Sequence, residues 1–197
     1  MKKILILIVL AILVPLVYLV MSNYNNIPKL DENVSEKWSQ VQNQYKRRAD
    51  LIPNLVATVK GYAEHEKGTF VEVTEARSKV SQMNINADTL NNPAAMEQFS
   101  QAQAGLSSAL SKLMVVVEKY PDLKANENFK ALQSQLEGTE NRITVARKDF
   151  IEAVKLYNIE LRTMPGKLVA AIAHPSAQIK ESFKASPTEQ DAPKVQF

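Results

Sequence analysis

The chain has 197 residues, of which 23% are charged, 45% are hydrophobic and 5 are glycine. This length suits one ordinary domain with an attachment, and the composition excludes a wholly disordered chain. So few glycines disfavour an all-β fold and a Gly-rich phosphate-binding loop, and the absence of cysteine excludes disulfides, thiolate metal sites and cysteine nucleophiles. The 24 basic residues are nearly balanced by 21 acidic ones, which predicts no nucleic-acid partner.

The first predicted element is a membrane span from Ile4 to Met21, in which every residue except Pro15 is apolar. At ~1.5 Å per residue this run is roughly 27 Å long, close to the thickness of a bilayer hydrocarbon core. The rival interpretation is a cleaved signal peptide, but the run is long and no Ala-x-Ala pattern follows it. Residues 1–21 are therefore predicted to be an uncleaved, single-pass anchor.

The charges that flank this run predict its orientation. Lys2 and Lys3 precede it, and only Lys29 follows it closely. The positive-inside rule then places the N-terminus in the cytoplasm and the rest of the chain on the extracytoplasmic side of the membrane. The basic cluster Lys46-Arg47-Arg48 leaves the opposite topology open.

A polar linker is predicted for residues 22–30, with Asp31 or Ser35 capping the helix that follows. From Val34 to Val80, positions at alternating spacings of four and three are mostly apolar or aromatic. This seam predicts one long amphipathic helix or two collinear halves.

Two further long helices and a shorter one are expected after a polar connection at residues 84–92. The second helix should begin with Asn92 as its N-cap and stop at Pro121. The third should run from about Asn126 to before Pro165, because it carries a strict seven-residue apolar repeat: Phe129, Leu136, Ile143, Phe150 and Tyr157. The fourth is predicted as a broken helix, from Leu168 to Ala173 and from Ala177 to Phe183.

These elements predict an all-α fold in which an N-terminal transmembrane helix precedes an elongated antiparallel helical bundle, with three long helices and a shorter, broken C-terminal helix. The bundle is expected to cover residues 31–185. Residues 186–197, with two prolines and alternating charges, are predicted to be a flexible tail.

No pattern of residues predicts a reaction or a bound cofactor. His65 lies between Glu64 and Glu66, but neighbouring side chains on a helix diverge by about 100° and do not converge on one ion. Glu137 and Glu140 form one Glu-x-x-Glu pair without the second set that a di-iron bundle needs. We therefore expect no catalytic, cofactor-binding or metal-binding residues, and no enzyme.

The densest local oddity is the stretch Arg47-Arg48-Ala49-Asp50-Leu51-Ile52-Pro53-Asn54. Pro53 lies inside a helical pattern, and Arg48 occupies a seam position where an apolar residue is expected. One interpretation is a proline kink in which Asn54 or an arginine satisfies the freed carbonyl and Asp50 neutralises the arginines. The other is a kinked, charged patch that contacts a partner protein or anionic lipid.

These residues also resemble a known family. The block Arg47-Arg48-x-Asp50-Leu51-Ile52-Pro53-Asn54-Leu55-Val56, with Gly61-Tyr62-Ala63 after it and Leu136-Glu137-Gly138-Thr139-Glu140-Asn141-Arg142-Ile143 in the later half, is similar to the LemA family. The likeness extends from the predicted anchor to the C-terminus. It implies a bacterial, single-pass, membrane-anchored helical bundle, and it implies no established activity.

The sequence thus favours a non-enzymatic envelope protein that serves as a scaffold or adaptor for unidentified protein partners. The alternative is a membrane-organising protein that oligomerises along the bilayer, so a homo-oligomer stays open. The residues beyond Met21 contain 22 of the 24 basic residues and all 21 acidic ones, so their net charge is close to zero. This charge balance disfavours strong attraction to anionic lipid.

Overall fold

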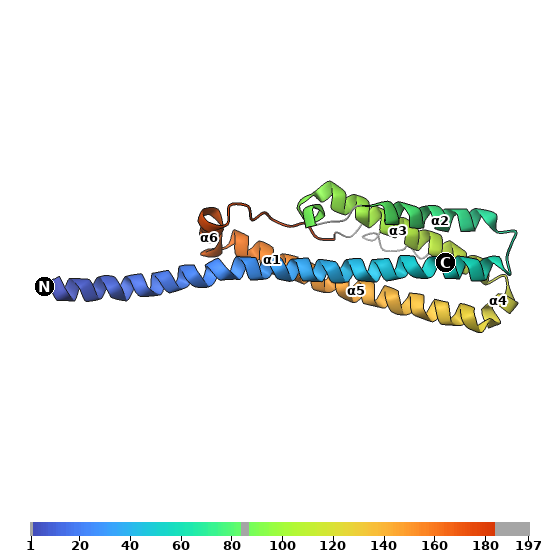
Figure 1. Ribbon diagram of the computed structural model, residues 1–197, viewed down its shortest axis with the longest axis horizontal. Helices are drawn as coiled ribbons and strands as arrows, with labels where there is room; N and C mark the ends of the chain where they lie inside the picture. The colour runs from blue at the N-terminus through green and yellow to red at the C-terminus, as the bar shows by residue number, and fades with distance from the viewer. Residues whose placement is uncertain (1, 84–86, 184–197) are drawn as a thin grey trace, which may run out of the picture. The chain divides into compact units, whose positions relative to one another are not determined.

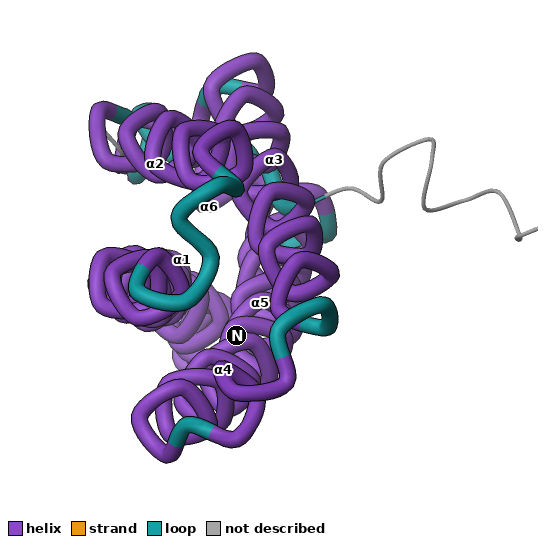
Figure 2. The backbone as a smooth tube through the Cα atoms, turned by 90° about the vertical axis from the view of Figure 1, so that its right-hand side faces the viewer, coloured by secondary structure: helices purple, strands orange, loops and turns teal. Residues whose placement is uncertain are grey.

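The computed structural model describes residues 2–83 and 87–183, and only part of the side chains before Tyr24. Its elements, in chain order, are α1 (Lys2–Lys60), α2 (Lys67–Gln82), the 3-10 helix η1 (Ala87–Asn91), α3 (Pro93–Val117), α4 (Pro121–Ala125), α5 (Glu127–Arg162) and α6 (Gly166–Ala173) (Figure 1). Helices and loops account for all of the described backbone (Figure 2), so the predicted all-α class is confirmed.

The chain divides into two compact units, and the first consists of Met1–Leu51 with Ala131–Lys180. In this unit α1 and α5 run antiparallel, because Trp38 packs on Phe150 while Arg48, further along α1, pairs with Glu140, which lies earlier in α5. Val34, Trp38, Val41 and Tyr45 of the predicted seam are buried. The seam therefore forms a helix interface, as predicted.

The second unit consists of Ile52–Lys130 with Glu181–Phe197. Here α2 and α3 lie side by side. They run antiparallel, since Glu66, just before α2, pairs with Lys119 and Glu72 pairs with the earlier Lys112. Asn92 caps α3 as predicted, because its side chain accepts hydrogen bonds from the backbone nitrogens of Ala94 and Ala95 at 3.0 and 3.2 Å.

The predicted span from Ile4 to Met21 lies within α1, and it falls partly on side chains outside the described residues. Among the helices as described, none is long and apolar enough to cross a membrane. A transmembrane helix is therefore not shown by the structure. The elongation expected from the helix lengths also stays a prediction.

The helix boundaries near the N-terminal half differ from the prediction in two places. Residues 22–30, expected to be a linker, are helical and continue α1, and Ile27 in this stretch is 2% exposed. The seam from Val34 to Val80 is also not one helix, because α1 stops at Lys60 and α2 starts at Lys67. Gly61 follows Lys60 directly, and its backbone nitrogen donates to the Ala57 carbonyl at 3.3 Å.

The C-terminal helix is shorter than predicted. Leu168 to Ala173 is helical within α6, but Ala177 to Phe183 has no helix. The Asn158 side chain explains part of this difference, since its amide donates to the Lys180 carbonyl at 2.8 Å and its oxygen accepts from the Lys180 nitrogen at 2.9 Å. A backbone amide held by a side chain in this way cannot join a helical hydrogen-bond ladder. The predicted tail at residues 186–197 lies outside the described residues.

Candidate functional site: a buried arginine and an amide-lined groove

Arg48 is the buried member of the predicted charged patch. Its side chain is 2% exposed, because it lies on the face of α1 that packs against α5. There Arg48 Nη1 donates to Glu140 Oε1 at 2.9 Å, and the guanidinium carbon lies 5.1 Å from the centre of the Tyr45 ring. The Glu140 side chain is 43% exposed, so solvent reaches the carboxylate end of this pair. Arg48 thus occupies the seam position with its charge paired to Glu140 and its guanidinium group beside the Tyr45 ring.

Tyr45 and Arg147 complete what we call the arginine cluster, which consists of Tyr45, Arg48, Glu140 and Arg147. Burial raises the pKa of the Tyr45 phenol above its ordinary value, although the guanidinium groups of Arg147 and Arg48 act in the opposite direction. The phenol is therefore neutral at physiological pH and is unsuited to act as a base. The cluster has the features of a structural connection between α1 and α5.

The rest of the predicted patch is exposed, and the structure does not gather it around Arg48. Arg47 and Asp50 lie on the exposed side of α1 in the first unit, while Pro53 and Asn54 are exposed in the second unit. The helix continues on both sides of Pro53, where the Thr58 hydroxyl donates to the Asn54 carbonyl at 2.8 Å. The kink at Pro53 and the role of the patch as a partner surface stay predictions.

A groove between α1 and α5, close to the arginine cluster, was not predicted from the sequence. Its volume is about 410 Å³, and it is open to solvent. It is lined by residues from α1 and α5, both in the first unit: Gln40, Asn43, Gln44, Asn141, Arg142, Val145, Ala146 and Asp149. Three of its four amide side chains recur at helical spacing on α1, and this recurrence is the one signal in the sequence that pointed to that wall, whereas α5 contributes a single amide, Asn141.

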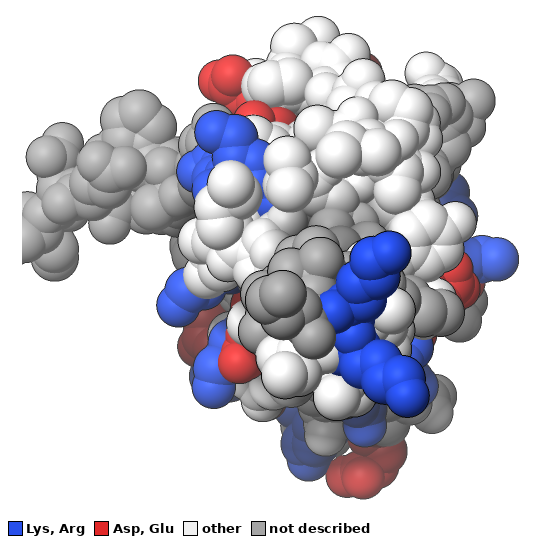
Figure 3. All heavy atoms as spheres, turned by 90° about the vertical axis from the view of Figure 1, so that its left-hand side faces the viewer, with Lys and Arg blue, Asp and Glu red and all other residues white. Residues whose placement is uncertain are grey.

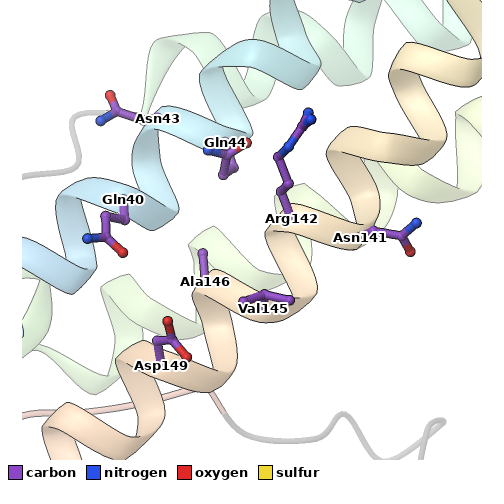
Figure 4. A pocket seen from close by; sticks show the side chains of 8 residues that line it. All are labelled: Gln40, Asn43, Gln44, Asn141, Arg142, Val145, Ala146 and Asp149. Atoms are coloured by element: carbon purple, nitrogen blue, oxygen red, sulfur yellow. The ribbon is translucent and has the colours of Figure 1, made fainter.

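The lining combines amides at the rims with a small apolar floor (Figure 4). Gln44 and Arg142 lie across from each other between the two helices, whereas Asn43 and Asn141 point away from the centre. Ala146 is buried and provides the room for the groove. Arg142 and Asp149 lie about two helical turns apart on α5, so the groove offers one positive and one negative end.

This lining is suited to hydrogen bonding. Amide side chains both donate and accept, as a polypeptide backbone does, and the groove contains neither a hydroxyl or thiol nucleophile nor a histidine base. Over residues 2–83 and 87–183, no three His, Cys, Asp or Glu side chains gather as they would around a metal ion. The arrangement can bind an extended polar segment.

Comparisons with known proteins give one family and several relatives. A model described as the LemA family matches residues 37–197. Magnetosome proteins MamQ 2 and MamQ 1 of Paramagnetospirillum magneticum are each 26% identical in an alignment over 168 residues that covers 76% of this chain and 61% of theirs. Protein LemA of Metamycoplasma hominis is 23% identical over 146 residues, which are 74% of this chain and 63% of its own. The chain thus matches less than two thirds of the length of these relatives.

Proposed function

Because the chain belongs to the LemA family, we propose that it is a membrane-anchored, non-enzymatic helical protein that acts as a scaffold or adaptor for other proteins. Its N-terminal segment inserts into the cytoplasmic membrane, and the helices that follow hold a binding surface beside that membrane.

The observation that carries the anchoring is the change of environment along α1 within the first unit. Before Tyr24, the large apolar side chains that the structure describes are exposed: Ile4, Ile6, Leu7, Leu10, Leu13, Val14 and Tyr18. From Ile27 onward, the apolar seam of the same helix is buried. Each exposed aliphatic side chain forgoes roughly 1.5–3 kcal/mol of burial free energy in water, and a bilayer core supplies that burial.

The scaffold role is supported by the chemistry of the groove. The amides of Gln40 and Gln44 and one charge of each sign provide directional hydrogen bonds, and these suit recognition of an extended peptide segment. Three of the relatives are named as proteins of one cellular structure, the magnetosome. Those names support a place in an assembly for the present chain.

The anchoring can be tested by extraction of the full chain from bacterial membranes. We expect the protein to remain in the pellet after washing with concentrated salt and with alkaline carbonate. A Leu10→Asp, Val14→Asp variant should move to the supernatant, because each charge in the middle of a span costs about 2.5–3.5 kcal/mol. The matched Leu10→Ala, Val14→Ala variant should stay in the pellet. Release of the wild-type protein by carbonate would contradict the anchoring.

The scaffold role can be tested by photo-cross-linking in the native host. A photoreactive amino acid at Val145 faces the groove, whereas the same group at Ile151 lies on the opposite side of α5. We expect a discrete adduct with another protein from position 145 and none from position 151. An adduct with a second copy of the chain would instead support a membrane-organising oligomer. Equal labelling patterns at both positions would count against the groove as a binding surface.

A further inference from the structure

Helix α6 exposes its two largest aliphatic side chains, Leu168 and Ile172. Leu168 is 53% exposed and Ile172 is 76% exposed, and they share one face of the helix because they are four residues apart. Met164, in the turn that precedes α6, is 72% exposed. The opposite face is buried through Val169 and Ala170. Thus α6 is held against the first unit by one side and presents an uncovered apolar side to its surroundings.

The charge pattern around α6 is as unusual as its exposure. Residues 163–179 contain no Asp or Glu, although the chain has 21 acidic residues, and their only titratable groups are Lys167 and His174. Figure 3 views the protein from the end at which α1 begins, and uncharged side chains lie there beside blue Lys and Arg side chains and some red carboxylates. A segment without carboxylates, such as residues 163–179, meets little repulsion from anionic lipid headgroups.

The position of α6 relates it to the apolar start of α1. In Figure 1, α6 lies beside the early part of α1, and two contacts fix it there. His174 Nε2 lies 3.0 Å from the Tyr24 carbonyl oxygen, and the two rings are 4.7 Å apart. Tyr24 comes three residues after Met21, which is roughly 4.5 Å along a helix axis. The end of α6 is therefore level with the end of the apolar run.

We propose that α6 is an interfacial helix, which inserts Met164, Leu168 and Ile172 into the headgroup and acyl boundary of the bilayer that holds the N-terminal segment. This inference rests on the proposed anchoring of Ile4 to Met21. Amphipathic helices lie in that boundary when one face is apolar and basic residues flank it. Lys167 is placed to extend its ammonium group to lipid phosphates while its methylene chain covers apolar surface. Such a helix would set the orientation of the first unit relative to the bilayer.

The test uses the absence of cysteine in the natural chain. Full-length protein with one introduced cysteine carries an environment-sensitive fluorophore, at Leu168→Cys or Ile172→Cys, in vesicles of phosphatidylcholine and phosphatidylglycerol. Leu10→Cys serves as the control within the anchor, and Ala131→Cys, exposed on α5, serves as the aqueous control. Far-UV circular dichroism establishes that each labelled protein is folded. Lipids with a quencher near the headgroup or deep in the acyl chain report the depth of each label.

We expect the labels at positions 168 and 172 to lose about half of their fluorescence or more to the shallow quencher. The label at position 10 should respond to the deep quencher, and the label at position 131 to neither. If positions 168 and 172 behave like position 131 while position 10 is quenched, α6 is not interfacial although the anchoring holds. If position 10 is not quenched, the anchoring itself fails. Shielding of positions 168 and 172 without quenching would show a protein partner or a second copy there, and would overturn the lipid assignment.

Discussion

At the scale of single residues, Arg48 shows both the reach and the limit of sequence reasoning. Its seam position marks it as an exception, because every helical turn around it buries an apolar or aromatic residue. Its partner, Glu140, is 92 positions away. Several carboxylates of α5 recur at helical spacing, and only the register of the two packed helices selects one of them. That register comes from side-chain packing, such as Trp38 on Phe150, and is not encoded in any local pattern.

Loss of the carboxylate partner should destabilise the first unit. Glu140→Gln leaves the Arg48 charge buried without a compensating carboxylate, so we expect the free energy of unfolding to fall by about 1–3 kcal/mol. The loss is modest because solvent at the half-exposed Glu140 carboxylate weakens its attraction to Arg48. Trp38 is the single tryptophan, and it lies in this unit. Its fluorescence during urea unfolding of the full chain in mild detergent therefore measures the effect.

Two other variants separate the charge from the packing. Glu137→Gln changes an exposed carboxylate one turn away and should alter stability by less than about 0.5 kcal/mol. Arg48→Met combined with Glu140→Leu removes both charges and keeps apolar volume, so it should be less harmful than Glu140→Gln alone. Equal stability of the two single glutamine variants would contradict a structural role for the pair.

The raised pKa of Tyr157 leads us to expect a loss of stability in alkaline solution. Burial, and then the nearby Asp31 carboxylate, raise the pKa of Tyr157 to about 12 from an ordinary 10.0. A raised pKa means that the fold favours the neutral phenol. The contribution is therefore complete below pH 10 and is lost as pH rises from 10 to 12. The charges facing the ring are Asp31 from α1 and Lys180 from the segment after α6.

The expected size of this loss is about 2–3 kcal/mol, since each of the two pKa units corresponds to about 1.4 kcal/mol. The Tyr157→Phe variant has no phenol to ionise. Unfolding free energies of the wild type and the variant are measured by Trp38 fluorescence at steps from pH 8 to pH 12, and above pH 10 the wild type should lose stability relative to the variant by this amount. Parallel curves over the whole range would show that Tyr157 does not titrate in this way.

At the scale of elements, the start of α3 could be predicted from the sequence. Asn92 and Pro93 mark the start of α3 by their chemistry. Pro121, where a helix was expected only to stop, also begins the short helix α4, which was not predicted. The break between α1 and α2 could not be predicted, because the apolar positions on its two sides keep the same helical spacing. Tyr62, inside the break, is 43% exposed, and α2 packs beside α3. Periodicity predicts that a segment is amphipathic, but it does not say whether the helix continues between two such segments.

Two glycines of this fold should respond to alanine in opposite directions. A Cβ added at Gly166 would lie 2.3 Å from the Glu160 backbone oxygen, so Gly166→Ala must displace the start of α6. We expect a loss of about 1–3 kcal/mol and faster amide hydrogen exchange in α6. A Cβ at Gly105, inside α3, meets nothing within 4 Å. Gly105→Ala should therefore raise stability by about 0.5–1 kcal/mol.

Thermal unfolding followed by far-UV circular dichroism measures both glycine variants, and hydrogen exchange localises the change at α6. A Gly166→Ala variant as stable as Gly105→Ala, with unchanged exchange in α6, would mean that the close approach of Gly166 to Glu160 is not required for the fold.

At the scale of the whole molecule, charge is distributed unevenly along the chain. Lys2 and Lys3 supply two of the three net positive charges, and the residues beyond Met21 are almost neutral. The all-α class and the antiparallel pairs follow from helical periodicity and short connections. The groove does not, because it depends on which amides of α1 meet which residues of α5. The orientation of the proposed span likewise stays a prediction, and the positive-inside rule derives it from the balance of charges at both ends of the apolar run.

That balance predicts a topology that single-cysteine labelling can test. With Lys2 and Lys3 before the run and only Lys29 soon after it, the N-terminus should stay in the cytoplasm and α5 should lie outside. A membrane-impermeant maleimide added to spheroplasts should therefore label Ala131→Cys, and Lys3→Cys should be labelled only after lysis. Changing both Lys2 and Lys3 to Glu removes the basic bias, so a fraction of Ala131→Cys should become protected in that background. Protection of Ala131→Cys in the otherwise natural chain would show that the cluster at Lys46, Arg47 and Arg48 determines the orientation instead.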